Sequence, residues 1–178
     1  MIGNFDGVHR GHQKLIALTV KRAKLLGAQP CALTFSPHPR RFFQGASEPP
    51  MLTDDVEKAS LLQSHGIEQT VVLPFDAALA NQSPLEFVEK VLKRDLGAVH
   101  VVVGAGYRFG RGREGGVDYL RRLGRTHGFG VTVASRAVCA SGEEFSSTRV
   151  RQALAQGDLV KARAFLGRSW SHVAERLK

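Results

Sequence analysis

The chain has 178 residues, 43% of them hydrophobic, and a formal net charge of +9 at pH 7. This length and composition predict one globular domain with a sizeable core. No apolar run is long enough to span a bilayer, no signal peptide opens the chain, and two cysteines are too few for a disulfide framework. We therefore expect a cytoplasmic protein without a membrane partner.

The positive charge is concentrated in residues 108–125 and 149–163. No nucleic-acid-binding motif accompanies it, and the aromatic residues are not interleaved with it, so a nucleic acid is not expected as a partner. Most of these basic side chains are expected on solvated helix faces, where they would attract anions toward a site that uses one or two of them.

Short apolar segments alternate with helix-like segments along the chain. Five segments have the pattern of strands: residues 1–4, 31–35, 70–73, 100–103 and 131–134. Four longer segments have the periodicity or the terminal signals of helices: residues 12–26, the segment between Asp54 and Gly66, 84–95 and 118–127. Residues 36–50, with four prolines, are predicted to form a loop, and a last pair of short helices is predicted to begin at Ser146 or Ser147 and to separate at Gly157. The alternation predicts an α/β fold, with an open parallel sheet covered by helices on both faces.

Two histidines three residues apart open the first long helix. His9 and His12 follow a glycine-bounded turn, and positions i and i+3 are neighbours on one helix face. The helix start also offers unpaired backbone N–H groups and the positive end of the helix dipole, and Gly11 carries no side chain that would obstruct a ligand. The pattern predicts a phosphate site suited to a phosphoryl-type transition state.

Other interpretations of these motifs are weaker. A single histidine at a helix start is often only a solvated or capping residue, but a pair with a glycine between them is less ordinary. Histidines at i and i+3 can chelate a metal, but no Cys-x-x-Cys and no third clustered ligand accompanies them, so no protein metal site is expected. Gly104 and Gly106 follow a predicted strand, but the spacing to Gly110 is one residue too long for a dinucleotide fingerprint.

The motif also carries a family resemblance. His9-Arg10-Gly11-His12 matches the His-x-Gly-His signature of the nucleotidylyltransferase superfamily. The longer segment 2–13, IGNFDGVHRGHQ, resembles the adenylyltransferase module of prokaryotic FAD synthetases, which are bifunctional riboflavin kinase/FMN adenylyltransferases. Three further segments agree with the family in the same order: residues 34–39, 103–110 and 145–151. The resemblance extends to about residue 167. Four matching segments at the carboxyl ends of strands or at a helix start are expected to converge on one site.

The resemblance implies a Rossmann-like nucleotidylyltransferase domain in residues 1–167. It implies adenylyl transfer from ATP to FMN, giving FAD and pyrophosphate, with Mg²⁺ on the triphosphate. Residues 168–178 form a tail at the point where a riboflavin kinase domain would begin in the family. No riboflavin kinase activity is therefore expected in this chain, and a separate kinase domain or partner is expected to supply FMN.

Residue roles carried over from the family fall into three sets. The catalytic set comprises His9, His12 and Asn4. The ATP-binding set comprises Gly3, Gly7, Gly11, Ser146, Ser147, Thr148 and Arg151. The flavin-binding set comprises Phe35, Pro37, His38 and Phe109, because an isoalloxazine ring needs a flat apolar wall.

The sequence departs from the family at three positions. The family usually carries a carboxylate at Ser36, an Asn or Asp at Gly106 and an Asp at Gly116. Two alternatives stay open: a module that binds flavin or nucleotide without turnover, for which Ser36 and Gly106 are the evidence, and a nucleotidylyltransferase for another small phosphorylated acceptor. Segment 34–39 argues against the second alternative.

Overall fold

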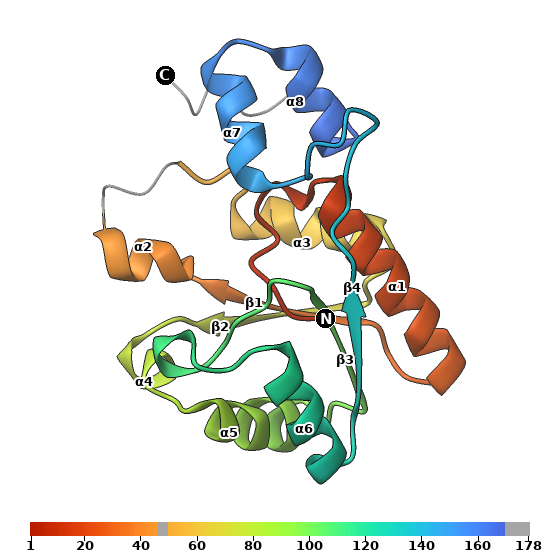
Figure 1. The fold of residues 1–178 in the computed structure, drawn as a ribbon, viewed down its shortest axis with the longest axis vertical. Coiled ribbons are helices and arrows are strands. Elements are labelled where there is room, and N and C mark those ends of the chain that lie inside the picture. Colours follow the sequence, from red (N-terminus) through yellow and green to blue (C-terminus); the bar gives the residue numbers. More distant parts are fainter. Residues whose placement is uncertain (46–49, 170–178) are drawn as a thin grey trace.

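Parallel strands form the centre of the fold, seen in a computed structural model that describes residues 1–45 and 50–169 (Figure 1). β1 (Cys31–Ser36) pairs with β2 (Gln69–Pro74), in a register that places Cys31 opposite Gln69. β3 (His100–Gly104) pairs with β4 (Gly130–Ala134) in the same parallel sense. The four strands agree with the predicted ones to within one or two residues at each end.

The first residues of the chain join these two pairs. Ile2 forms a parallel bridge with Leu33 of β1, and its N–H donates to the carbonyl of Val102 in β3 at 3.2 Å. The carbonyl of Met1 accepts a hydrogen bond of 2.9 Å from the N–H of Leu33. Residues 1–4, predicted as a strand end, therefore form no strand, but a single bridge at Ile2 links the two strand pairs.

Helices cover both faces of this sheet. α1 (Arg10–Leu26) and α3 (Asp55–Ser64) lie on one face. α5 (Pro84–Glu86), the π-helix that continues it (Phe87–Asp95) and α6 (Val117–His127) lie on the other. The arrangement confirms the predicted α/β architecture.

The core follows the alternation of side chains along β3. Val101 and Val103 are buried against the π-helix and α6, whereas Val102 is buried against α1 and α3. A third, smaller cluster lies apart from the sheet and packs Leu52 against apolar residues of α7 (Ser147–Ala155) and α8 (Leu159–Leu166). Figure 1 shows α7 and α8 together at one end of the molecule, near the start of α1.

The prediction of a continuous loop at residues 36–50 was wrong. α2 (Pro39–Gln44) occupies part of it, with the proline in its first turn, and the His38 side chain accepts a hydrogen bond from the N–H of Arg40. Residues 46–49 of that predicted loop lie outside the described residues. A second short helix, α4 (Ala77–Ala80), was not predicted; the side chain of Asp76 caps it.

The predicted helix at 84–95 is present at these bounds. Ser83 and Glu86 form a complete capping box at its start. Beyond Glu86 the hydrogen bonding changes from the α to the π pattern, which the sequence did not indicate. Across residues 1–45 and 50–169, no helix has both the length and the hydrophobicity needed to cross a bilayer.

Candidate active site

A turn of unusual backbone conformation leads into the paired histidines. Phe5, Gly7 and Val8 have φ angles of 50°, 77° and 39°. Left-handed backbone costs a non-glycine residue on the order of 1–2 kcal/mol, so Phe5 and Val8 adopt it only where surrounding contacts hold them. The turn ends at His9, the residue that precedes α1.

Asp6 holds this turn through its carboxylate. The residue is buried, with 3% of its surface exposed. One carboxylate oxygen accepts hydrogen bonds from the N–H groups of Leu52 and Thr53, at 2.8 and 3.2 Å. The other accepts a hydrogen bond of 2.6 Å from Arg151 of α7. Asp6 thus joins the turn to two distant segments of the chain.

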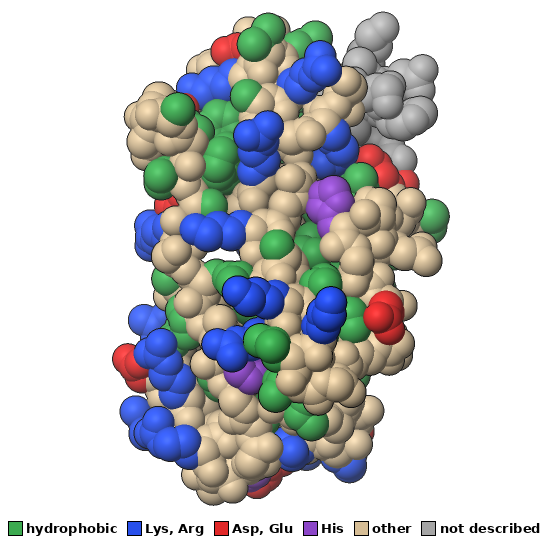
Figure 2. Space-filling view, turned by 90° about the vertical axis from the view of Figure 1, so that its right-hand side faces the viewer, with side chains coloured by type: hydrophobic (Ala, Val, Ile, Leu, Met, Phe, Trp, Pro, Cys, Tyr) green, Lys and Arg blue, Asp and Glu red, His purple; other side chains and the backbone are tan. Residues whose placement is uncertain are grey.

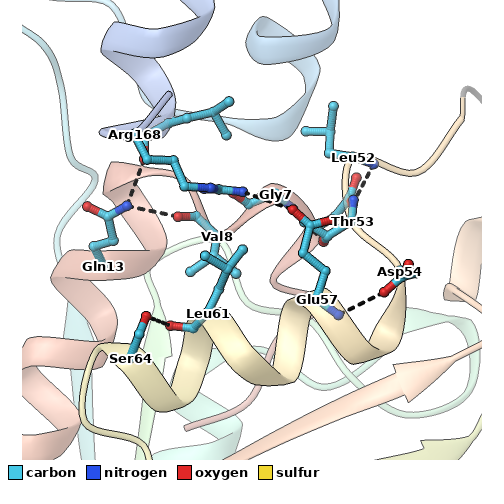
Figure 3. A network of polar contacts seen from close by, with 12 residues as sticks. Gly7, Val8, Gln13, Leu52, Thr53, Asp54, Glu57, Leu61, Ser64 and Arg168 are labelled. Carbon is cyan, nitrogen blue, oxygen red and sulfur yellow. Dashed lines mark hydrogen bonds and ion pairs between the residues drawn. The ribbon is translucent and has the colours of Figure 1, made fainter. Parts of the chain in front are cut away.

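The backbone of the turn is held from several other sides. The N–H of Gly7 donates to the Thr53 hydroxyl at 3.1 Å, and its carbonyl accepts a hydrogen bond of 2.8 Å from Arg168 (Figure 3). The carbonyl of Asp6 accepts a hydrogen bond of 2.8 Å from the Ser147 hydroxyl. These contacts stabilise the strained conformation that places His9.

The two imidazoles stack on each other beyond this turn. The ring centroids of His9 and His12 are 3.7 Å apart with 23° between the ring planes, and Phe5 meets His12 edge-on at 5.4 Å. Among the described residues, neither His9 Nδ1 nor His12 Nδ1 has a hydrogen-bond partner, although both atoms are buried. A buried polar atom without a partner is costly, and a ligand with oxygen atoms would satisfy both.

Burial sets the protonation state of both rings. Burial and, to a smaller extent, the positive charge of Arg151 together lower the pKa of His9 to about 4. Burial and the neighbouring His9 hold the pKa of His12 well below 6.5. Both rings are therefore neutral at pH 7 in the ligand-free protein.

Gly11 lies in tight contact with the His9 ring. A Cβ atom at this position would lie 3.0 Å from the His9 ring and 3.2 Å from the carbonyl oxygen of Phe145. The glycine therefore makes room for the stacked ring, as well as leaving backbone accessible to a ligand.

Two cavities meet beside the histidines. The smaller, of about 350 Å³, is lined by His9, Gly11 and His12 and by the residues that follow β3 and β4. The larger, of about 760 Å³, extends away past β1 and α2. Gly3, Gly106 and Tyr107 line both cavities, so these residues mark the boundary between them.

Aromatic rings and arginines line the larger cavity. The rings belong to Phe35, Phe42, Phe43, Phe75, Phe87, Tyr107 and Phe109. None of its described lining residues is Asp or Glu. Four arginines line it as well: Arg40, Arg108, Arg111 and Arg113. Such walls suit a flat aromatic ligand that carries negative charge.

The structure brings some of the predicted site residues together at these cavities. Gly3, His9, Gly11 and His12 line the smaller one, and Gly3, Asn4, Phe35 and Phe109 line the larger one. Phe109 is also part of the core, being 6% exposed with its ring stacked 5.5 Å from that of Tyr107.

Other predicted residues line neither cavity. Gly7 is enclosed in the turn, where a Cβ would lie 2.8 Å from Leu52, and Pro37 and His38 lead from β1 into α2. The remaining predicted ATP-binding residues are at the start of α7. Ser146 caps this helix, Ser147 and Arg151 bind the turn, and Thr148 is exposed.

Sequence reasoning missed several lining residues. Ser135, Arg136 and Ala137 follow the carboxyl end of β4 and line the smaller cavity. The position of a strand end, which indicated the other segments, would have indicated this one too. The aromatic pair Phe42 and Phe43 was hidden because α2 was not predicted.

The three departures from the family have distinct surroundings. Ser36 ends β1, and its hydroxyl donates a hydrogen bond of 2.6 Å to the carboxylate of Asp55, so a carboxylate from α3 lies against this position. Gly106 has open space around it, since a Cβ there would meet nothing within 4 Å and its φ is not left-handed. Gly116 precedes α6 without a capping side chain, beside the guanidinium of Arg108.

The described residues contain no cluster of three or more His, Cys, Asp or Glu side chains that could hold a metal ion. The carboxylate of Asp6, within the turn, already accepts hydrogen bonds from two backbone N–H groups and from Arg151. These residues fit a magnesium ion carried by phosphate oxygens better than one in a protein cage.

Comparisons with known proteins agree with this geometry. Residues 1–149 match the family model described as FAD synthetase. A bifunctional riboflavin kinase/FMN adenylyltransferase of Pseudomonas fluorescens is 40% identical over 94% of this chain and 53% of its own length. A protein of the same name from Escherichia coli strain K12 is 35% identical over 93% of this chain and 53% of its own length, so this chain spans about half of such relatives.

A shorter relative is covered almost completely. A putative bifunctional riboflavin kinase/FMN adenylyltransferase of Geobacillus thermodenitrificans is 37% identical over 93% of this chain and 87% of its own length. Among solved structures, one described as a macrolide-efflux protein from Streptococcus pneumoniae superimposes with a TM-score of 0.81 at 26% identity, covering 94% of this chain and 55% of its own. That structure shares the fold of this chain. The family match over residues 1–149 and the relatives establish that the chain belongs to the FAD synthetase family.

Proposed function

We propose that residues 1–167 form an FMN adenylyltransferase domain that makes FAD and pyrophosphate from FMN and ATP. One observation carries the proposal: two cavities meet at Gly3 and Gly106, directly beside the stacked pair His9 and His12. A reaction that joins two phosphate-bearing substrates needs two adjoining pockets, with hydrogen-bond donors to the phosphate oxygens close to where the pockets meet.

The reaction needs no nucleophile from the protein. A phosphate oxygen of FMN attacks the α-phosphorus of ATP, a new P–O bond forms, and the bond to the β-phosphate oxygen breaks as pyrophosphate leaves. Negative charge on the triphosphate would raise the pKa of the neutral imidazoles, so that His9 and His12 donate hydrogen bonds to the α-phosphate and the bridging oxygen. Asn4, which follows Gly3 at the boundary, offers an uncharged amide.

The rest of the triphosphate is assigned to two helix starts. α1 offers the backbone N–H groups of its first turn beside Gly11, and α7 offers those of Ser147 and Thr148. Arg151 already binds Asp6 with one of its five N–H donors, and the others remain suited to the β- and γ-phosphates. Mg²⁺ would arrive bound to the triphosphate, neutralising charge there.

The larger cavity is assigned to the flavin. Its aromatic wall, which includes Phe35 and Phe109, matches a flat ring system, and its arginines match the phosphate of FMN. Pro37 and His38 would shape this pocket indirectly, by setting where α2 begins. Basic side chains elsewhere are spread over the face shown in Figure 2, rather than gathered into one patch, which fits general attraction of anions.

The test is direct. The purified chain is incubated with FMN, ATP and Mg²⁺, and FAD and pyrophosphate are quantified; formation of both in equal amounts is the expected result. FMN binding without FAD would instead identify a binding module. Adenylylation of nicotinate mononucleotide or phosphopantetheine in preference to FMN would identify another acceptor. A cytoplasmic location belongs to the same proposal.

A further inference from the structure

Arg168 lies far from the histidines in sequence but contacts the turn that positions them. Its guanidinium donates a hydrogen bond of 2.8 Å to the carbonyl of Gly7, across 161 positions of the chain (Figure 3). The side chain is 23% exposed, and a second guanidinium nitrogen lies 3.9 Å from the carboxylate of Glu57 in α3. Burial lowers the pKa of Arg168, although the residue remains charged at pH 7.

A second contact ties the same segment to the same turn. The side-chain amide of Gln13 donates to the carbonyl of Val8 at 3.0 Å and to the carbonyl of Leu166 at 2.7 Å. Consecutive carbonyls of the turn, those of Gly7 and Val8, are thus both linked to residues 166–168. Figure 3 shows the Arg168 and Gln13 side chains both extending to the turn.

The turn has little freedom to satisfy these carbonyls otherwise. Gly7 has a φ of 77°, and Leu52 and Leu166 lie within 3.5 Å of where a Cβ would be, so its peptide is enclosed between Leu52 and the end of α8. Val8, with its left-handed φ, leads directly into His9. Rotation of the Gly7–Val8 peptide would therefore move the His9 ring.

We propose that Arg168 is a positioning residue for adenylyl transfer, which holds the Gly7 carbonyl and thereby fixes His9 against the reacting phosphate. The proposal rests on the proposed function. A misplacement of about 1 Å can cost up to roughly 100-fold in rate, so loss of this contact is expected to lower kcat about 10-fold or more. Arg168 lines neither cavity, so the KM for FMN is expected to stay within about 2-fold.

The test compares three variants in the intact chain. Arg168→Ala removes the contact, and Arg168→Lys retains a cation with a shorter reach. The control is Arg163→Ala, which removes an exposed arginine of α8 in the same region. Steady-state kinetics give kcat and KM for FMN, and amide hydrogen exchange of Gly7, Val8 and His9 reports the turn without reference to activity.

We expect R168A to lower kcat and to speed exchange of these amides, R168K to fall between R168A and the wild type, and R163A to match the wild type. Guanidinium chloride, well below denaturing concentrations, should restore part of the activity that R168A loses. It should not raise the activity of R163A.

If R168A does not fold, R168K carries the same comparison. The proposal is overturned if the folded variant keeps wild-type kcat and exchange, or if only KM for FMN changes. A wild-type chain that makes no FAD would instead contradict the proposed function.

Discussion

Arg151 and Asp6 form a nearly buried ion pair, with 2.6 Å between the guanidinium nitrogen and the carboxylate oxygen. The side chains are 18% and 3% exposed. The pair joins α7 to the turn before His9, and it also places a positive charge close enough to the ring to lower the pKa of His9. Arg151 therefore has a structural task besides the phosphate-binding one that we propose.

Replacing Arg151 by Met should destabilise the protein markedly. The change leaves the buried Asp6 carboxylate without its ionic partner, which typically costs about 3 kcal/mol. Arg149→Met is the matched control on the same helix, since its pair with Glu143 is 41% and 30% exposed and should be worth about 1 kcal/mol or less. Urea unfolding at pH 7 measures both, and equal losses would contradict the role of the buried pair.

Replacing His12 by Ala should lower the turnover of FAD synthesis roughly 100- to 1,000-fold, by analogy with loss of one oxyanion-hole donor. FMN affinity should change little, because the effect belongs to the transition state and His12 does not line the larger cavity. Steady-state kinetics and flavin fluorescence titration measure the two quantities. Near-normal adenylyl transfer by a folded His12→Ala protein would remove His12 from the mechanism.

Stability should fall as the pH is lowered from 6.5 to about 4. In this window an unfolded histidine takes up a proton, whereas His9, with a pKa of about 4, stays neutral in the folded protein; above pH 6.5 both states are neutral and the contribution vanishes. His9 alone can account for up to about 3 kcal/mol, and His12 acts in the same direction.

The matching experiment follows urea unfolding between pH 4.5 and about 7.5, a range set by the ordinary histidine pKa. His9→Gln should flatten the profile below pH 6.5, whatever its stability at pH 7. An identical slope for His9→Gln and the wild type would show that His9 titrates normally.

The pair of Lys58 and Asp55 should respond unequally to mutation. The ammonium lies 2.8 Å from the carboxylate, but the lysine side chain is 2% exposed and the aspartate side chain 44%. Asp55→Asn leaves a buried charge without its anion and should cost about 3 kcal/mol, whereas Lys58→Met leaves only a solvated carboxylate and should cost less than about 1 kcal/mol. Thermal or urea unfolding of the two variants gives the order, and a more damaging Lys58→Met would reverse the argument.

Much of this architecture could be read from local signals. Alternating apolar runs gave the strands, and capping residues such as Ser83 gave helix starts, because these features act over a few neighbouring residues. That His9 and His12 lie next to each other could be predicted for the same reason. The contacts of Asp6 could not be predicted, since its partners Leu52 and Arg151 lie 46 and 145 positions away in the sequence.

The errors have equally local causes. Pro37 and Pro39 suggested a loop at residues 36–50, yet a proline in the first turn is compatible with a helix, and α2 begins at Pro39. The phosphate-binding role of Ser147 stays a prediction, and the structure adds a contact of this residue that the sequence did not indicate. Its hydroxyl donates to the carbonyl of Asp6, a contact that only the folded chain creates.

Replacing Gly106 by Asn should raise the rate of FMN adenylylation. Gly106 lies at the boundary of the two cavities, where an amide could hydrogen-bond the acceptor phosphate and hold it in line with ATP. A Cβ there meets nothing within 4 Å and the backbone is not left-handed, so the side chain should fit without strain. Gly104→Asn is the control, because a Cβ at Gly104 also meets open space but the position lines only the smaller cavity. Comparison of kcat/KM for FMN measures the gain. A folded Gly106→Asn protein with unchanged or lower kcat/KM would show that the open boundary itself serves the reaction, and that no polar group is missing there.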